Sequence, residues 1–392
     1  MNETILNTGV QDFINNNWNA DIMSVLLKKP FFKGVSQKEL AEQLEAKKKC
    51  KNKLPTWFGT PNIYYPNKLN IEQTSSEITA AYKAQLIDGE SLLDMTGGFG
   101  VDSFYFSKKV GQVTHCEVDK NLSQMAAYNF EKLGVTNCRF EPKDGIHFLE
   151  GGHQKFNWIF ADPSRRHDVK GKVFRLEDCE PNIPKNLDSI FNHTDCILLK
   201  TSPLLDLTLA VKELKNVFQI HVIAVQNEVK EVLFILKKEV GEALKVSTVN
   251  LKRGEEIHFE FQLNSEKAGE VDYSTPENYL YEPNAAILKA GGFNSVGMQL
   301  GLKKIAPHSH LYTSQDLVDF PGRIFKIQDV RPYTKGTMKA LKGTKANLTI
   351  RNFPESVQQL RKKYQISDGG DNYFFFSTDR NGDKVVINCT KV

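Results

Sequence analysis

The sequence predicts an α/β fold, in which a mostly parallel sheet is preceded by a helical segment and followed by a smaller α+β region. Short apolar runs alternate with amphipathic helical runs between residues 72 and 238, which is the pattern of βαβ units. A glycine-rich turn follows the first apolar run, as in sheets that bind ligands at their strand ends. With 392 residues, of which 40% are apolar and 25% charged, the chain is long enough for two or three globular domains.

Several features argue against other classes of protein. No apolar run approaches the ~20 residues that span a bilayer, and the first residues lack the basic and apolar regions of a signal peptide. The six cysteines are scattered without a CxxC pair, and His308 and His310 have no cysteine or carboxylate ligand set nearby. We therefore expect a cytoplasmic protein with no membrane partner and no metal site, and the sequence leaves its oligomeric state open.

The charge is unevenly distributed along the chain. Residues 320–392 contain 14 Lys+Arg and 6 Asp+Glu, which gives this stretch a net charge of +8. The whole chain has a net charge of +4, so the other residues together have a net charge of −4. Lys335, Lys339 and Lys342 fall near helical spacing, and residues 361–363 form a second basic cluster. A basic tail favours a polyanionic partner such as RNA, although solvated surface lysines would give the same count.

The expected elements follow in chain order. Residues 1–60 predict short helices, one of them N-capped by Ser36, and the aromatic, proline-rich stretch 56–70 predicts an irregular connector. The strands 218–225 and 231–237 are joined by a link too short for a helical crossover, so they are predicted to be antiparallel. The preceding strands are expected over 91–95, 112–118, 138–142, 156–163 and 196–202, and helices over 101–110, 121–134, 144–151 and 205–216.

Beyond residue 240 the pattern changes. Residues 245–263 alternate like two strands with a turn at Arg253–Gly254, and the stretch that follows predicts two helices and a strand. The tail predicts a strand, a helix and a hairpin that turns at Asn381–Gly382. Tyr373 to Phe376 lie on a strand of this hairpin, where alternation predicts at least one exposed ring. The predicted domains are 1–70, 71–240, 241–318 and 319–392.

Three acidic residues follow three consecutive predicted strands. Asp94 ends the first strand and precedes the glycines of TGGFG, which let a ligand approach the backbone at a helix N-terminus. Glu117 ends the second strand, where a carboxylate can accept both ribose hydroxyls, and Asp144 after the third strand could accept from an adenine amine. Because the carboxyl ends of parallel strands meet at one edge, these groups are expected to line one crevice.

Simpler explanations hold for the neighbouring residues. Asp119 is expected to N-cap the helix that begins near Asn121. Asp102 is expected to stabilise the first helix, because a negative charge near the helix N-terminus interacts favourably with the helix dipole. A glycine-rich turn between a strand and a helix also occurs at NAD and flavin sites, so the loop alone does not identify the cofactor.

The chain resembles class I S-adenosylmethionine (SAM)-dependent methyltransferases, a Rossmann-like family, in four segments that match their motifs I to IV: LLDMTGGFG, CEVD, KDG and ADPSRR. The hairpin that ends the predicted sheet and the Asp-Pro pair after the fourth strand favour this family over NAD enzymes. The resemblance implies that SAM is the cofactor. The cofactor-binding residues that it implies are Ser76, Asp94, Thr96, Gly97, Gly98, Gly100, Glu117, Asp144 and Asp162.

The residues after the fourth strand usually face the acceptor in this family. They keep the first two positions of the Asn/Asp/Ser-Pro-Pro-aromatic motif of base amino-methyltransferases and depart at the next two, so the aromatic that would stack on a flipped base is absent. Asp162 could accept a hydrogen bond from an attacking nitrogen, or it could be a turn carboxylate. The predicted catalytic residues are Asp162, Pro163, Ser164 and Arg165.

Arg166 and Arg175 are the predicted substrate-binding residues, because a guanidinium suits a phosphate or a carboxylate. The alternative for the arginines after the fourth strand is a salt bridge to Glu177 or Asp178 in the following loop. A cysteine nucleophile for carbon methylation is not expected, since neither ADPSRR nor LLKTSP contains one.

The lead-in EQTSSEITAAYKA resembles that of one group of RNA methyltransferase-like proteins, in which it lies across the cofactor crevice. There Thr74, Ser75 and Ser76 could donate to the methionine carboxylate, or they could cap the helix from Glu77. In the same group a THUMP-like domain follows the core, and a ferredoxin-like tail comes last. Residues 241–318 resemble the THUMP-like domain in the segments YEPNAAILKAG and HLYTS, and residues 319–392 resemble the ferredoxin-like tail. THUMP domains occur in RNA-modifying enzymes.

The sequence thus predicts a SAM-dependent methyltransferase that modifies a nitrogen of a base in structured RNA, either tRNA or rRNA. One alternative is a protein or small-molecule methyltransferase whose arginines bind a carboxylate. The other is an RNA-binding factor with a vestigial SAM pocket.

Overall fold

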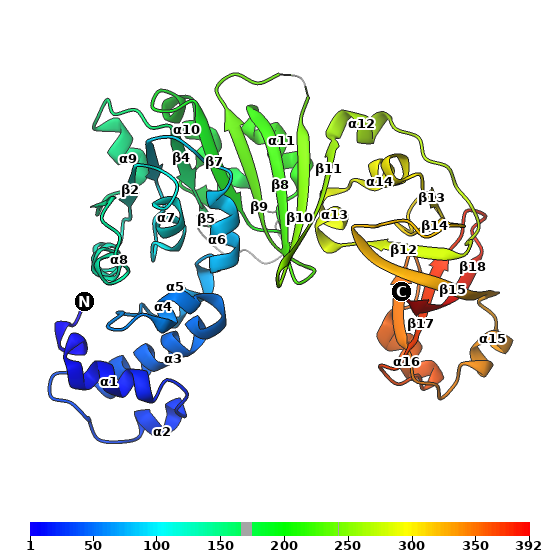
Figure 1. Cartoon of the computed structure of the whole chain (residues 1–392), viewed down its shortest axis with the longest axis horizontal. Helices are drawn as coiled ribbons and strands as arrows, with labels where there is room; N and C mark the ends of the chain where they lie inside the picture. Colours follow the sequence, from blue (N-terminus) through cyan, green and yellow to red (C-terminus); the bar gives the residue numbers. More distant parts are fainter. Residues whose placement is uncertain (166–174, 242) are drawn as a thin grey trace. The chain divides into compact units, whose positions relative to one another are not determined.

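The computed structural model describes residues 1–165, 175–241 and 243–392. Its internal contacts divide the chain into two compact units (Figure 1). The first unit comprises Met1–Phe218 and Leu233–Val240, and the second comprises Gln219–Val232 and Gly241–Val392. Within the described residues, no helix is both long enough and apolar enough to cross a membrane.

Short helices form the N-terminal part of the first unit, drawn in blue in Figure 1. Ser36 N-caps the longest, as predicted: its hydroxyl accepts from the Glu39 amide at 3.2 Å, and the Glu39 carboxylate accepts from the Ser36 amide at 2.9 Å. Ile14 and Leu44 are fully buried in the apolar cluster that joins these helices. The elements are η1 (Glu3–Leu6), α1 (Thr8–Asn16), α2 (Ile22–Leu26), α3 (Gln37–Lys53), α4 (Pro55–Gly59) and α5 (Lys68–Gln73).

A parallel sheet forms the centre of the first unit. Its strand order is β3-β2-β1-β4-β7-β9, and the pairs β1–β2, β2–β3, β1–β4 and β4–β7 are parallel. Leu93, Ile159 and Leu198 are fully buried, as is usual for parallel strands that are covered on both faces. The strands are β1 (Ser91–Asp94), β2 (Gln112–Cys116), β3 (Cys138–Glu141), β4 (Trp158–Ala161), β7 (Cys196–Thr201) and β9 (Glu228–Lys237). The helices are α6 (Glu77–Ala84), α7 (Val101–Phe106), α8 (Lys120–Lys132), α9 (Gly145–Glu150), α10 (Ile183–Phe191) and α11 (Leu207–Leu214).

The predicted hairpin is formed by β8 (Val217–Val225) and β9. Gln226 and Asn227 connect them with φ angles of 52° and 64°, and positive φ at both central residues is typical of a two-residue type I′ turn. A turn of this length joins antiparallel strands. In the strand order β9 lies between β8 and β7, so the second strand of the predicted hairpin lies next to the last parallel strand.

In the second unit, two strands continue beside β8. β10 (Lys245–Lys252) pairs parallel with β8, and β11 (Glu255–Gln262) pairs antiparallel with β10. The turn between them at Arg253–Gly254 is where the alternation of the sequence predicts it, and α12 (Leu263–Ala268) follows. The strand pairing therefore joins residues 245–262 to β8 rather than to the sheet that follows in the chain.

A second sheet, of seven strands, contains the rest of the second unit. Its order is β13-β14-β12-β15-β18-β17-β16, and β15 pairs with both β12 and β18. The strands are β12 (Tyr279–Pro283), β13 (Lys303–Lys304), β14 (Tyr312–Ser314), β15 (Gly322–Pro332), β16 (Asn347–Arg351), β17 (Asn372–Thr378) and β18 (Lys384–Lys391). The helices are α13 (Ala285–Ala290), α14 (Phe293–Leu300), α15 (Lys335–Ala340) and α16 (Val357–Tyr364).

The strand, helix and hairpin of the tail are confirmed as β16, α16 and the pair β17–β18. The expected exposed ring on β17 is wrong. Phe375 and Tyr373 pack on one apolar cluster, whereas Phe374 and Phe376 pack on another. Alternation does place these rings on opposite faces, but both faces of this strand are covered.

The segment that leads into the sheet is fixed by a buried ion pair. The Lys83 ammonium of α6 lies 3.1 Å from an Asp102 oxygen of α7, and the Lys83 side chain has no exposed surface. The Ser75 hydroxyl donates to the other Asp102 oxygen at 2.7 Å and accepts from Lys83 at 2.9 Å. Asp102 thus has a buried partner in addition to its place in the first turn of a helix.

We expect Lys83→Met to lower the free energy of unfolding by about 3–5 kcal/mol, because it leaves the Asp102 carboxylate buried without its cation. Urea denaturation followed by circular dichroism measures this change. The double variant Lys83→Met/Asp102→Leu should recover most of the loss, since replacing a whole buried ion pair by apolar groups is often nearly neutral. A loss below about 1 kcal/mol in the single variant would contradict this role of the pair.

Candidate functional site

The glycine-rich turn connects β1 to α7. Gly98 and Gly100 have φ angles of 55° and 86°, a region that favours glycine. Gly97 is required for a different reason, because a Cβ there would lie 2.2 Å from Nε2 of the buried His115 ring on β2. At Gly98, by contrast, the nearest atom to such a Cβ is the Thr96 carbonyl oxygen at 3.8 Å. The loop therefore rests closely on β2 at Gly97, whereas a side chain at Gly98 would meet only an ordinary van der Waals contact.

Asp94 lies at the end of β1 and is 1% exposed. Its carboxylate accepts from the Ser103 hydroxyl at 2.6 Å and from the Thr96 amide at 3.1 Å. Burial raises the pKa of Asp94 to about 7, although the hydrogen bond from Ser103 opposes the shift. A buried acid with a raised pKa at the end of a strand marks a candidate functional site.

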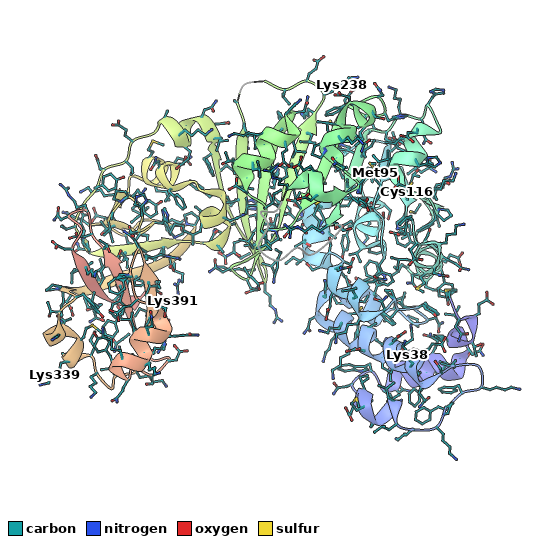
Figure 2. The ribbon with its side chains drawn as sticks, turned by 180° about the vertical axis from the view of Figure 1, so that it is seen from behind. Lys38, Met95, Cys116, Lys238, Lys339 and Lys391 are labelled. Atoms are coloured by element: carbon teal, nitrogen blue, oxygen red, sulfur yellow. The ribbon has the colours of Figure 1, made fainter. Side chains whose placement is uncertain are left out.

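Glu117 follows β2 and holds the glycine loop against that strand. One of its oxygens accepts from the Gly98 amide at 2.8 Å and the other from the Asp119 amide at 2.8 Å. The Gly97 amide also donates to the Cys116 carbonyl at 2.8 Å. Figure 2 shows Met95 and Cys116 close together where β1 and β2 end. Each Glu117 oxygen keeps a lone pair for a ligand hydroxyl.

The other acids near this edge form helix caps. Asp119 accepts from the Asn121 and Leu122 amides and N-caps α8, as predicted. Asp144 N-caps α9 by accepting from the His147 amide at 3.0 Å and is exposed. Between Glu117 and Asp119, the Val118 side chain is 72% exposed. Sequence reasoning missed this apolar surface, although an apolar residue between two acids after a strand was visible in the sequence.

The motif after β4 contacts both the glycine loop and the next strand. The Asp162 amide donates to the Thr96 hydroxyl at 2.7 Å, which links the turns after β4 and β1. The Asp162 carboxylate accepts from the ammonium of Lys200, a β7 residue with a 13% exposed side chain. Sequence reasoning missed Lys200, because only the fold brings two residues 38 positions apart together.

The residues after Asp162 have different environments. Pro163 is buried and Ser164 exposed. Ser164 and Arg165 form the short strand β5 (Ser164–Arg165), which pairs antiparallel with β6 (Cys179–Glu180). The short 3-10 helix η2 (Leu176–Asp178) directly precedes β6. Arg175 donates to the Glu177 carboxylate at 2.8 Å. Glu177, the expected partner of the arginines directly after the fourth strand, therefore binds Arg175. Arg166 lies outside the described residues.

The serines of the lead-in do not have equal roles. Ser76 N-caps α6 by accepting from the Thr79 amide at 3.3 Å, which is the capping alternative. Ser75 contacts Asp102 and Lys83. Among the predicted site residues, the structure thus links Asp94, Thr96 and Asp162 in one chain of contacts, and Gly98 with Glu117 in a second. Within the described residues, no hydrogen bond or ion pair joins Asp144, Ser76 or Arg175 to these two sets.

Two family models match the C-terminal part of the chain: a ferredoxin-like domain at residues 279–321 and a THUMP domain-like region at residues 322–391. No curated protein matches the sequence. The crystal structure of a "putative methyltransferase" from Porphyromonas gingivalis W83 is 29% identical and covers 100% of this chain and 99% of that one with a TM-score of 0.89. An rRNA methylase from Streptococcus thermophilus is 14% identical, with a TM-score of 0.31 over 42% of this chain and 95% of that one.

The chain therefore has, over its whole length, the fold of the P. gingivalis protein. This is an α/β fold with C-terminal ferredoxin-like and THUMP-like modules. The sequence predicted both modules but placed them in the reverse order, with the THUMP-like one first. The strand pattern did not separate them, because β12 and β15 belong to one continuous sheet that crosses the boundary at residue 322.

We expect Asp94→Asn to remove a pH dependence of stability. The pKa of about 7 in the folded state lies above the ordinary 3.8, so between these values the folded protein holds a proton that the unfolded chain releases. The stabilisation is present at about pH 4 and is lost as the pH rises through about 7. Urea denaturation between these limits should therefore show the variant gaining stability relative to the wild type as the pH rises. Asp12→Asn, at an exposed position, should show no such trend.

Proposed function

We propose that the chain is a SAM-dependent methyltransferase. The observation that carries the proposal is the meeting of Asp94, Glu117 and the glycine loop at the carboxyl edge of β1 and β2. Ligands of open α/β sheets bind at this edge. The full-length similarity to the P. gingivalis protein supports the same conclusion.

The residues present suit SAM. Glu117 has lone pairs left for the two ribose hydroxyls, and the exposed Val118 offers an apolar surface for the adenine ring. Asp144 would accept from the adenine amine. Asp94 and Thr96, with Gly97, Gly98 and Gly100, would hold the methionine end, because glycines let a ligand approach the backbone at a helix N-terminus. The Ser76 hydroxyl, which caps α6, keeps one further hydrogen-bonding position for the cofactor.

When bound, SAM supplies an electrophilic methyl group on a sulfonium whose leaving group is a neutral thioether. The protein's task is therefore mainly alignment in a site that excludes water. Asp162 would accept a hydrogen bond from the attacking nitrogen, and the Lys200 ammonium and the contact with Thr96 fix its position. Pro163, Ser164 and Arg165 would shape the acceptor side beside Asp162, while Arg166 and Arg175 would bind a phosphate of the substrate.

We infer that the acceptor is a nitrogen of a base in structured RNA, tRNA or rRNA. The net charge of +8 over residues 320–392 supports a polyanionic partner. Lys335, Lys339 and Lys342 are exposed on or beside α15, so they are available to phosphates. The THUMP-like match covers this same basic region.

We expect S-adenosylhomocysteine to bind the wild-type chain in calorimetric titration and Glu117→Gln to weaken that binding about 10- to 100-fold, because hydrogen bonds to a charged group contribute about 1.5–3 kcal/mol. Asp119→Asn is the matched control: it makes the same change of acid to amide two residues away, and asparagine caps a helix as well as aspartate does. Equal binding by Glu117→Gln and the wild type would exclude the assigned ribose contact.

We expect the wild-type chain to transfer a labelled methyl group from SAM to total RNA, and Asp162→Asn to lower the turnover at least about 100-fold while S-adenosylhomocysteine affinity stays the same. Lys200→Met should also lower turnover, because Asp162 loses the cation that positions it. Lys212→Met, an exposed lysine on α11, is the control. Labelling of protein or of small molecules instead of RNA would favour the alternative methyltransferase, and SAM-independent RNA binding without turnover would favour an RNA-binding factor.

A further inference from the structure

A pocket of about 600 Å³ lies in the second unit, away in sequence from the residues of the proposed methyl-transfer site. Of its nine lining residues, four are basic side chains or histidines, namely His308, His310, Arg351 and Lys384, and none is acidic. Its apolar wall includes Ile350 and Phe353. Small-molecule sites commonly have volumes of about 300–1,000 Å³ and combine an apolar wall with a few convergent polar groups.

Arg351 is positioned by a buried carboxylate that cannot neutralise all the charge around it. Its Nη2 donates to Glu282 at 2.8 Å, and the same carboxylate accepts from Arg323. Glu282 is 3% exposed. One negative charge thus faces two guanidinium groups, so this cluster of three side chains carries a net positive charge. The Arg351 Nε has no hydrogen-bond partner among the described residues.

The backbone of the pocket is held in an uncommon conformation at two lining positions. His310 and Asn352 have φ angles of 51° and 50°. Histidine and asparagine are among the residues other than glycine that adopt this region most often. The Thr378 hydroxyl donates to the Asn352 carbonyl at 2.6 Å, which fixes one of the two turns.

His310 is available as a neutral hydrogen-bonding group. Its ring stacks on Phe293 with the centroids 3.6 Å apart. Burial lowers the pKa of His310 to about 4, and the positive charges of Lys304, Arg351 and His308 add to the effect. At neutral pH the ring can donate one N–H without adding charge, and its Nδ1 is buried without a partner among the described residues.

We propose that this pocket binds a phosphorylated nucleotide, with its phosphate on Arg351, His308 and Lys384 and its base against Phe353. Guanidinium and ammonium groups form charge-assisted hydrogen bonds with phosphate oxygens. Phe353 offers a partly buried ring, which already packs edge-on against Tyr333, and aromatic rings stack on bases of any identity. The bound group is either a free nucleotide or one nucleotide of an RNA strand. In the second case the proposal rests on the RNA partner proposed above.

Calorimetric titration of the full chain with uridine 5′-monophosphate tests the proposal. A uridine nucleotide is chosen because it lacks the adenine that the proposed SAM site would bind. Inorganic phosphate and uridine are titrated in parallel, and a 5′-phosphorylated decamer of uridine represents the strand. The test variant is His308→Gln/Lys384→Gln, since both side chains are exposed and neither makes a hydrogen bond or an ion pair within the described residues. Lys326→Gln, an exposed lysine of β15 outside the pocket lining, is the control.

We expect the double variant to bind the nucleotide or the decamer about tenfold more weakly than the wild type, and Lys326→Gln to bind within about twofold of it. Binding of the mononucleotide identifies a free nucleotide as sufficient, and binding of the decamer alone identifies a strand. Equal affinities for inorganic phosphate and the mononucleotide would overturn the contact with the base. Failure of both uridine ligands to bind, or an equal loss in Lys326→Gln, would overturn the site. None of these results depends on SAM, so they are independent of the methyl-transfer assay.

Discussion

The parallel pairing of β1 with both β2 and β4 is the constraint on which the candidate site depends. Asp94 is in register with His115 on one side and with Phe160 on the other. Because all three strands run in the same direction, their following turns meet at one edge of the sheet. The Gly98 contact with Glu117 and the Thr96 contact with the Asp162 amide then join these turns to one another. A change of register in β1 would separate all of these groups at once.

The same region buries charge that a purely structural core would avoid. Asp94 is almost fully buried, and its pKa is raised to about 7 mainly because burial disfavours the carboxylate. Glu77 is 8% exposed and accepts from the Thr56 hydroxyl and the Tyr105 hydroxyl, which ties α4 and α7 to α6. With the ion pair of Lys83 and Asp102, these contacts anchor the lead-in to the first helix of the sheet. Such costs are tolerated where a ligand or a rigid site needs them.

In the second unit one carboxylate has a comparable role. Glu282 on β12 is paired with Arg323 on β15 and with Arg351 on β16. It therefore joins the ferredoxin-like match to the THUMP-like match within a single seven-stranded sheet. The two modules also share an apolar core, in which Leu280 and Leu311 pack with Phe325 and Phe375.

The sequence by itself determined the α/β order, the hairpin ending, the caps at Ser36 and Asp119, and the acids at the strand ends, because each depends on residues near in the chain. Tertiary structure alone decided the partner of Asp162, the burial of Lys83 against Asp102 and the covering of both faces of β17. Each of these depends on segments that are distant in sequence, and local periodicity carries no information about which distant segment covers a face or supplies a counter-charge. For the same reason the pattern identified two C-terminal modules but not their order, since one sheet runs through both.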